Sequence, residues 1–264
     1  MQKNWQLRMS LRSLKKMEKL KKILSFLEST SNKRCLEVGC NKGVISFFLR
    51  ARGGHWTNAD MDEQNVKDTK ELVGEDVCLI NTERLIFEDS SFDCIIAIDF
   101  LEHIYCDEDF LREFNRILKP KGSLYITSPH SNEKLLVVHK IRKYIGMNNS
   151  CYGHVRSGYS LVELQEKLFR TGFEVTCFDT FSRFFTEIIE LFLNFGYLFI
   201  LNKNKVISTN TNRISPVSQQ DFEKHRLLFL IYSLAYPLLW SLSQLDKLIW
   251  FTDGYVLILR AKKI

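Results

Sequence analysis

The sequence has few prolines and no cysteine pattern that would bind zinc, and both shortages exclude classes of protein. Its 264 residues include only 4 Pro and 12 Gly, so collagen-like, low-complexity and disordered classes are excluded. The 7 cysteines include no C-x-x-C pair, which argues against zinc ribbons and zinc fingers, and we predict no metal site. We expect free thiols, mostly buried, in a reducing cytoplasmic compartment.

The positive charge is confined to the start of the chain. The net charge is +6, yet residues 1–34 carry ten basic and two acidic residues, so the body is almost neutral. A basic stripe interleaved with aromatics is missing from that body, and we therefore predict no nucleic-acid partner. Residues 1–20 lack the continuous apolar run that is typical of a secretory signal. In residues 1–30, leucines spaced by three or four positions predict a basic amphipathic leader helix. Its lysines are either solvated or in contact with anionic lipid headgroups.

Short apolar runs alternate with helix-like stretches in the body. This alternation predicts an α/β fold with a mostly parallel sheet and helices on both faces. A capping box at Ser160 predicts the start of one more helix. We expect strands at 34–38, 55–59, 77–80, 94–98, 124–127, 173–178 and 255–260, and helices at 44–52, 65–73 and 108–118.

An apolar insertion separates the last two strands. It contains the segments 188–201, which is too short to span a bilayer, and 227–250, which is nearly long enough but is interrupted by Pro237. The insertion is either a buried helical cap or a surface that contacts a membrane or holds a lipid tail. The expected organisation is a leader at 1–30, an α/β domain at 31–178 plus 254–264, and the insertion at 179–253.

The loop after the first strand, Glu37-Val-Gly-Cys-Asn-Lys-Gly43, is the strongest candidate binding element. Glycines at 39 and 43 allow a tight turn and close approach of a ligand to a helix N-terminus. Asn41 stands where a dinucleotide-binding loop has a glycine, and Glu37 would repel a diphosphate. These two residues disfavour a nucleotide-dependent oxidoreductase. A carboxylate at that place can instead accept a hydrogen bond from a ligand ammonium group.

Asp60 ends the second predicted strand, where a carboxylate can accept hydrogen bonds from a ribose diol. The neighbouring Asp62 suits a helix N-cap better. Asp99 ends the fourth strand. It would orient a donor or acceptor, or would cap the helix that follows.

Residues 33–130 resemble class I S-adenosylmethionine-dependent methyltransferases, and are most similar to the ubiquinone and menaquinone biosynthesis type. The motifs that carry the resemblance lie at 36–43, 91–96, 99–103 and 118–124. The resemblance implies a Rossmann-like, seven-stranded class I methyltransferase fold and S-adenosylmethionine as the cofactor.

The resemblance also implies roles for single residues. The 37–43 loop would face the methionine part, Asp60 would bind the ribose hydroxyls and Met61 would flank the adenine, whose edge Asn81 and Thr82 would meet. Asn41 and Asn81 depart from the pattern, which more usually has Gly and Asp at these places. The cofactor-binding candidates are Glu37, Gly39, Asn41, Gly43, Asp60, Met61, Asn81, Thr82 and Asp99.

No single residue stands out as a general base. His103, His130 and His154 are candidates, since the pKa of histidine suits proton transfer near neutrality. Asp99 is a fourth candidate, and the alternative for each of the four is a purely structural role. Arg156 can bind an anionic group of an acceptor.

These observations predict a methyltransferase for a small, lipophilic or lipid-linked acceptor, because an apolar insertion would supply contact area for a long tail. We expect the protein in the cytoplasm. A further expectation is peripheral contact with the inner face of a membrane through residues 188–201 and 227–250. The alternative is a cofactor-binding protein without turnover, which would use the insertion as a protein or membrane interface.

Overall fold

The computed structural model describes residues 4–81, 84–131, 137–145, 153–196 and 219–264. Contacts divide the chain into two compact units. The sheet unit comprises residues 20–131, 158–180 and 256–264, and the helical unit comprises residues 1–19, 132–157 and 181–255.

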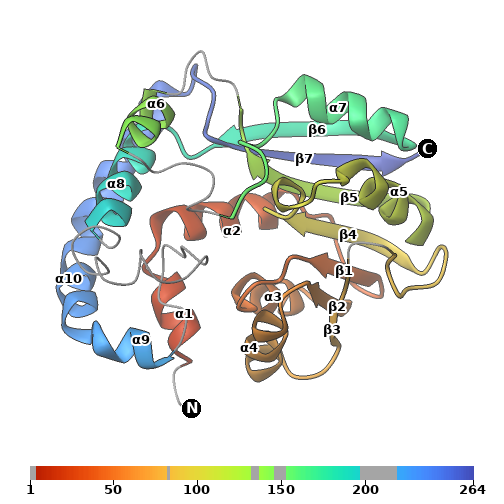
Figure 1. Cartoon of the computed structure of the whole chain (residues 1–264), viewed down its shortest axis with the longest axis horizontal. Coiled ribbons are helices and arrows are strands. Elements are labelled where there is room, and N and C mark those ends of the chain that lie inside the picture. Colours follow the sequence, from red (N-terminus) through yellow and green to blue (C-terminus); the bar gives the residue numbers. More distant parts are fainter. Residues whose placement is uncertain (1–3, 82–83, 132–136, 146–152, 197–218) are drawn as a thin grey trace. The chain divides into compact units, whose positions relative to one another are not determined.

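The sheet unit is built on a seven-stranded sheet with the order β3-β2-β1-β4-β5-β7-β6 (Figure 1). β1 pairs in parallel with β2 and β4, β4 pairs in parallel with β5, and β7 runs antiparallel to β5. The strands are β1 Arg34–Val38, β2 His55–Asp60, β3 Val77–Leu79, β4 Phe92–Ile98, β5 Leu118–Pro129, β6 Phe173–Phe181 and β7 Val256–Lys263. The predicted class of fold is therefore confirmed, including an apolar helical segment between the last two strands.

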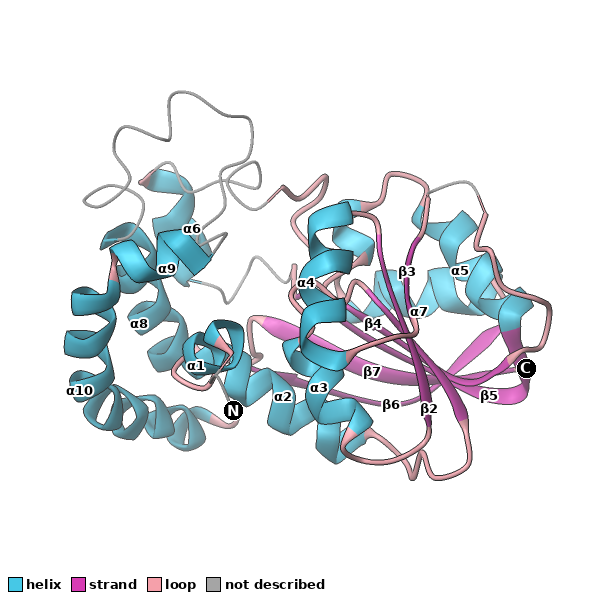
Figure 2. Cartoon of the chain, turned by 90° about the horizontal axis from the view of Figure 1, so that it is seen from below, coloured by secondary structure: helices cyan, strands magenta, loops and turns pink. Residues whose placement is uncertain are grey.

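Helices cover both faces of this sheet. α3 (Val44–Arg50) and α4 (Glu63–Val73) lie on one side of the strands, and α5 (Asp107–Ile117) lies on the other (Figure 2). Central strand residues such as Leu36 and Ile95 are fully buried, as expected for parallel strands covered on both faces. The predicted N-cap at Asp62 is confirmed, since its carboxylate accepts hydrogen bonds from two backbone N–H groups of the first turn of α4.

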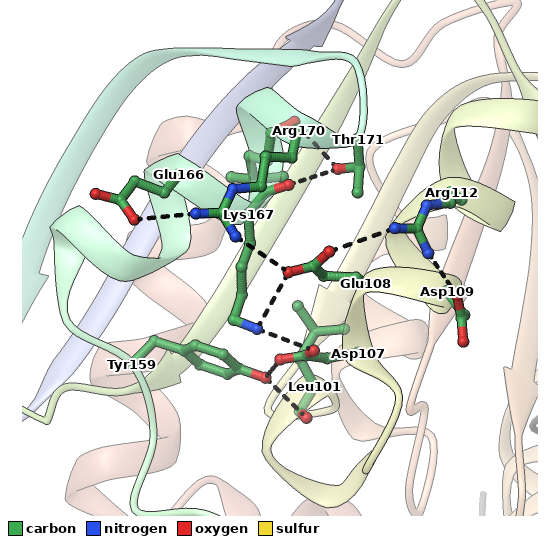
Figure 3. A network of polar contacts seen from close by, with 11 residues as sticks. Leu101, Asp107, Glu108, Asp109, Arg112, Tyr159, Glu166, Lys167, Arg170 and Thr171 are labelled. Carbon is green, nitrogen blue, oxygen red and sulfur yellow. Dashed lines mark hydrogen bonds and ion pairs between the residues drawn. The ribbon is translucent and has the colours of Figure 1, made fainter.

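A polar network fastens α7 (Leu161–Arg170) to α5 and to the short 3₁₀ turn η1 (Leu101–His103) (Figure 3). The buried Tyr159 hydroxyl lies 2.6 Å from the Asp107 carboxylate and 3.1 Å from the Leu101 carbonyl oxygen. Lys167 donates to Asp107 at 3.2 Å and lies 3.6 Å from Glu108. The predicted N-cap at Ser160 is present as well, because its hydroxyl accepts from the N–H of Glu163.

The described residues of the helical unit form mostly helices. The leader contributes two of them, α1 (Trp5–Ser10) and the first part of α2 (Leu14–Phe26), where the sequence predicts one. Residues 132–157 group with the insertion, although the sequence pattern places them in the α/β domain. The remaining helices that we describe in this unit are α6 Val137–Tyr144, α8 Phe184–Phe195, α9 Gln219–Lys224, α10 Arg226–Ser243 and the 3₁₀ helix η4 Gln244–Ile249.

Pro237 does not interrupt the apolar helix, contrary to the prediction from sequence, because α10 continues through it. A proline removes one backbone N–H and crowds the preceding turn. Packing of one side of α10 against α8 accompanies the unbroken helix.

A buried ion cluster ties the leader to the insertion within the helical unit. The fully buried Glu187 carboxylate accepts from Lys15 at 2.6 Å, Arg142 at 2.7 Å and the Ser182 hydroxyl at 2.5 Å. Burial opposes the charge, but the two cations outweigh it and lower the pKa of Glu187 to about 2. The part of the leader that belongs to this unit is thus packed against the insertion.

Candidate functional site

The candidate site lies at the carboxyl ends of the central strands of the sheet unit. The strand order changes direction between β1 and β4, and such a switch point is where open α/β sheets bind ligands. Three acids predicted from the sequence come to this edge: Glu37 within β1, Asp60 at the end of β2 and Asp99 directly after β4.

The loop between β1 and α3 has a left-handed backbone at three places. Gly39 and Gly43 have φ of 79° and 73°, and Asn41 has φ of 50°. A Cβ on Gly39 would lie 3.2 Å from the Ile98 carbonyl oxygen, so glycine is needed for the close approach of the loop to the end of β4. Asparagine tolerates the left-handed conformation better than most residues. Asn41 therefore replaces the usual glycine at a backbone conformation that asparagine can adopt.

Asp60 holds this loop in place. One carboxylate oxygen accepts from the backbone N–H of Asn41 at 2.8 Å, and the other accepts from the backbone N–H of Asp62 and the Asn65 amide, both at 3.0 Å. Only 7% of Asp60 is exposed. The oxygen that accepts from Asn41 has a second lone pair, so these bonds leave one acceptor site for a hydroxyl group of a ligand.

Glu37 lies beneath the loop, almost completely buried. Its carboxylate accepts from the Ser46 hydroxyl at 2.5 Å and from the Asn58 amide at 2.6 Å, and Asn58 in turn accepts from Arg50. Burial and, to a smaller extent, the charge of Asp60 raise the pKa of Glu37 to about 7 against these hydrogen bonds. In this geometry Glu37 joins β1 to β2 and to α3.

Asp99 has an unusual backbone at the other side of the switch point. Its φ is 45°, its N–H donates to the Thr127 carbonyl oxygen at 3.0 Å, and its carboxylate accepts from the Thr127 hydroxyl at 2.9 Å. The side chain is half-buried. Strained non-glycine residues cluster at ligand sites, and Asn41 and Asp99 place two of them at this switch point.

The residues expected near an adenine follow β2 and β3. Met61 is half-buried and packs against the core, and Asn81 is exposed, with a side-chain oxygen that accepts from the N–H of Arg84 at 3.2 Å. Thr82 lies outside the described residues.

The candidate bases are divided between the two units. His103 ends η1 and is half-buried, and His130 follows β5 and is 5% exposed. Since β4 and β5 are neighbours, Asp99 and His130 follow the carboxyl ends of two adjacent strands. His154 and Arg156 are half-buried residues of the helical unit.

Three polar residues with structural roles at this site were not anticipated from the sequence. Asn58 and Thr127 are buried within strands and bond to Glu37 and Asp99, and Tyr159 secures the turn that ends at His103. A polar residue inside an otherwise apolar strand was the available signal for the first two.

Comparisons with known proteins find methyltransferases among the relatives of this chain. Residues 36–126 match the family described as methyltransferase domain. The ubiquinone biosynthesis O-methyltransferase of Pseudomonas aeruginosa (strain UCBPP-PA14) is 26% identical over 110 residues, which cover 39% of this chain and 47% of that protein. The enzyme of the same name from Idiomarina loihiensis is 26% identical over 121 residues, 42% of this chain and 50% of that protein. The chain thus spans about half the length of these relatives.

Solved structures share the fold over almost the whole chain. A Bacillus halodurans C-125 protein described as a methyltransferase has a TM-score of 0.59 at 14% identity, with 93% of this chain and 99% of that chain covered. The [4+2]-cyclase SpnF has a TM-score of 0.60 at 18% identity, covering 94% and 80%. The comparisons confirm the resemblance to class I methyltransferases, while the cyclase shows that this fold alone does not determine the reaction.

Proposed function

We propose that this chain, whose residues 36–126 match a methyltransferase domain, transfers a methyl group from S-adenosylmethionine to a small lipophilic or lipid-linked acceptor. The observation that carries the proposal is the bonding of Asp60 to the loop that contains Gly39, Asn41 and Gly43. This arrangement puts a carboxylate and a closely approaching backbone at one strand edge.

The residues present fit the cofactor. A nearly buried carboxylate at the end of β2 can accept a hydrogen bond from a ribose diol, and Gly39 lets the loop approach the end of β4, so that the loop backbone borders the place proposed for the methionine part. Met61 would flank the adenine and Asn81 would meet its edge. Glu37, already bonded to Ser46 and Asn58, would support the loop from below and face the ligand ammonium group with its remaining capacity.

The protein has little covalent chemistry to perform, because the sulfonium of the cofactor supplies an activated methyl group. The residues of the chain hold the acceptor in line and take up a proton where the acceptor has one to lose. Asp99 is the proposed orienting group at the switch point. Among the candidate bases, His103 and His130 belong to the same unit as Asp99.

A lipophilic acceptor is supported by the insertion and by the relatives. The insertion exposes a long apolar helix, α10, which offers contact area for a lipid tail. The relatives act in ubiquinone biosynthesis by name. We accordingly propose a cytoplasmic enzyme that works at the inner face of a membrane, with the segments 188–201 and 227–250 as the contact elements; residues 197–201 lie outside the described residues.

The test is transfer of labelled methyl from S-adenosylmethionine into a host-cell extract, followed by separation into organic, aqueous and protein fractions. Asp60→Asn should weaken cofactor binding by roughly 10- to 100-fold, because an amide cannot accept from donors on both sides. Asp62→Asn is the matched control: it removes the same charge two residues away, and asparagine is an equally good N-cap.

Each result has a distinct meaning. Label in the organic fraction that is lost in Asp60→Asn and kept in Asp62→Asn supports the full proposal. Label in the aqueous or protein fraction would retain methyl transfer and overturn the lipophilic acceptor. Cofactor binding without any label would favour a binding protein without turnover.

A further inference from the structure

We propose that α10 lies flat in the interface of an anionic lipid bilayer, with its outward face in the lipid and its inward face packed on the helical unit. The proposal commits to a bilayer as the occupant of this face. It rests on the proposed function for its biological consequence, which is access to a lipid-dissolved acceptor, but its physical argument and its test do not involve methyl transfer.

The outward face of α10 is an apolar stripe. Leu227, Ile231, Leu234, Leu238 and Leu242 follow one another at intervals of three or four residues and are 71%, 57%, 84%, 66% and 43% exposed. At 1.5 Å per residue the stripe is about 22 Å long. A helix on the surface of a water-soluble domain normally carries polar residues on its outward face. A stripe of this length therefore marks a surface that something apolar covers.

The opposite face of α10 contacts the protein through half-buried aromatic residues. The Phe229 ring contacts that of Phe222 with 5.0 Å between centroids, the Tyr232 hydroxyl donates to the Arg12 carbonyl oxygen, and the Arg12 guanidinium lies over the Tyr236 ring. Packing on one side prevents lipid from surrounding the helix.

The end of the apolar segment is fixed as well. Arg226–Ile249 is long and apolar enough to cross a membrane by length and composition, but it includes the buried Asp246. The carboxylate of Asp246 accepts backbone N–H groups of Arg183, Phe185 and Thr186 at the start of α8, at 2.7–3.1 Å. A helix in the membrane plane keeps this contact together with those of Phe229 and Tyr232 within α10, which a spanning helix would exchange for lipid.

Charge at the two ends of α10 suits an anionic surface. Lys224 and Arg226 are exposed at the N-terminal end and Lys247 at the C-terminal end, while no charged residue lies between 227 and 245. Long basic side chains beside an apolar stripe can reach headgroup phosphates. Trp250 and Phe251, 75% and 71% exposed, add aromatic rings of the kind enriched at membrane interfaces.

The experiment measures co-sedimentation of the full chain with sucrose-loaded vesicles, without cofactor or acceptor. Equal parts of phosphatidylglycerol and phosphatidylcholine should bind the protein at least roughly tenfold more tightly than phosphatidylcholine alone. Leu234→Glu/Leu238→Glu should reduce binding by roughly a hundredfold, since two leucines leave the lipid and two charges approach it. The matched control is Val162→Glu/Phe169→Glu on α7, where both residues are similarly exposed, at 63% and 73%.

Circular dichroism and thermal unfolding establish that each variant is folded. The proposal is supported if only the α10 variant loses binding, and if excess unloaded vesicles remove the bound protein, as they would not remove a spanning helix. Equal binding by both double variants would overturn it. A concentration-dependent dimer that Leu234→Glu/Leu238→Glu abolishes, without vesicle binding by the wild type, would assign the stripe to a second copy of the chain and also overturn it. Failure of the wild type to bind vesicles would reject this proposal together with the membrane contact of the proposed function, while the proposed methyl transfer has its own test and would stand.

Discussion

Replacing Glu37 by glutamine tests the buried network beneath the candidate cofactor loop. The glutamine carbonyl oxygen can still accept from Ser46 and Asn58 in place of the carboxylate. The substitution therefore keeps the size and the hydrogen bonds of the side chain while it removes a buried titrating group.

The magnitude follows from the raised pKa of Glu37, about 7 in the folded chain against an ordinary value of 4.5. Between these values the folded protein holds a proton that the unfolded chain has released, so the free energy of unfolding falls as pH rises. At about 1.4 kcal/mol for each unit of pKa difference, the fall amounts to about 3 kcal/mol and is complete above pH 7. Relative to the wild type, Glu37→Gln should therefore gain about 3 kcal/mol between pH 4.5 and pH 8.

Urea unfolding of both proteins between pH 5 and pH 8 measures this difference, and other titrating groups cancel in the comparison. Glu71→Gln, at an exposed position of α4, controls for the change in net charge. Unfolding free energies of the wild type and Glu37→Gln that stay parallel over the whole pH range would refute the reasoning. Parallel curves would mean that Glu37 is not held in a buried, proton-retaining environment.

Three further predictions concern other fixed points of the structure. Gly43→Ala, which would bring a Cβ within 3.0 Å of Thr69 at a left-handed φ, should cost about 1–3 kcal/mol in urea unfolding and weaken cofactor binding in calorimetry. Tyr159→Phe removes the hydroxyl that bonds to Asp107 and should lower the free energy of unfolding by about 1–3 kcal/mol; an unchanged melting curve would contradict it. Glu187→Gln leaves two cations without their buried counter-charge and should cost about 3–5 kcal/mol at pH 7. Because the pKa of Glu187 is lowered to about 2, this contribution is present above about pH 4.5 and should fade as pH falls toward 2, which acid titration followed by circular dichroism can show.

Much of the sheet unit was predictable because its signals are local. Alternating apolar runs and helix-like stretches placed the strands and the crossover helices, and the caps at Asp62 and Ser160 depend on residues within three positions. The positions of the glycine loop and of Asp60 were also predictable, because both directly follow or end predicted strands. The resemblance to methyltransferases followed from these motifs.

The partners of the site residues were not predictable in the same way. Glu37 bonds to Asn58, 21 positions away, and Asp99 bonds to Thr127, 28 positions away. Spacing within the sequence does not indicate such pairs, because they depend on which strands become neighbours in the sheet. The left-handed backbone of Asn41 is likewise visible only once the loop meets Asp60 and the end of β4.

The amino-acid sequence by itself determined the α/β class, the parallel strands joined by crossover helices and the apolar character of the segment 227–250, since local periodicity and composition decide these properties. Tertiary structure alone decided which side of α10 is covered. Leucines that pack in a core and leucines that face outward have the same composition and the same helical spacing. Only the contacts of Phe229, Tyr232 and Asp246 with distant parts of the helical unit leave Leu234 and Leu238 exposed.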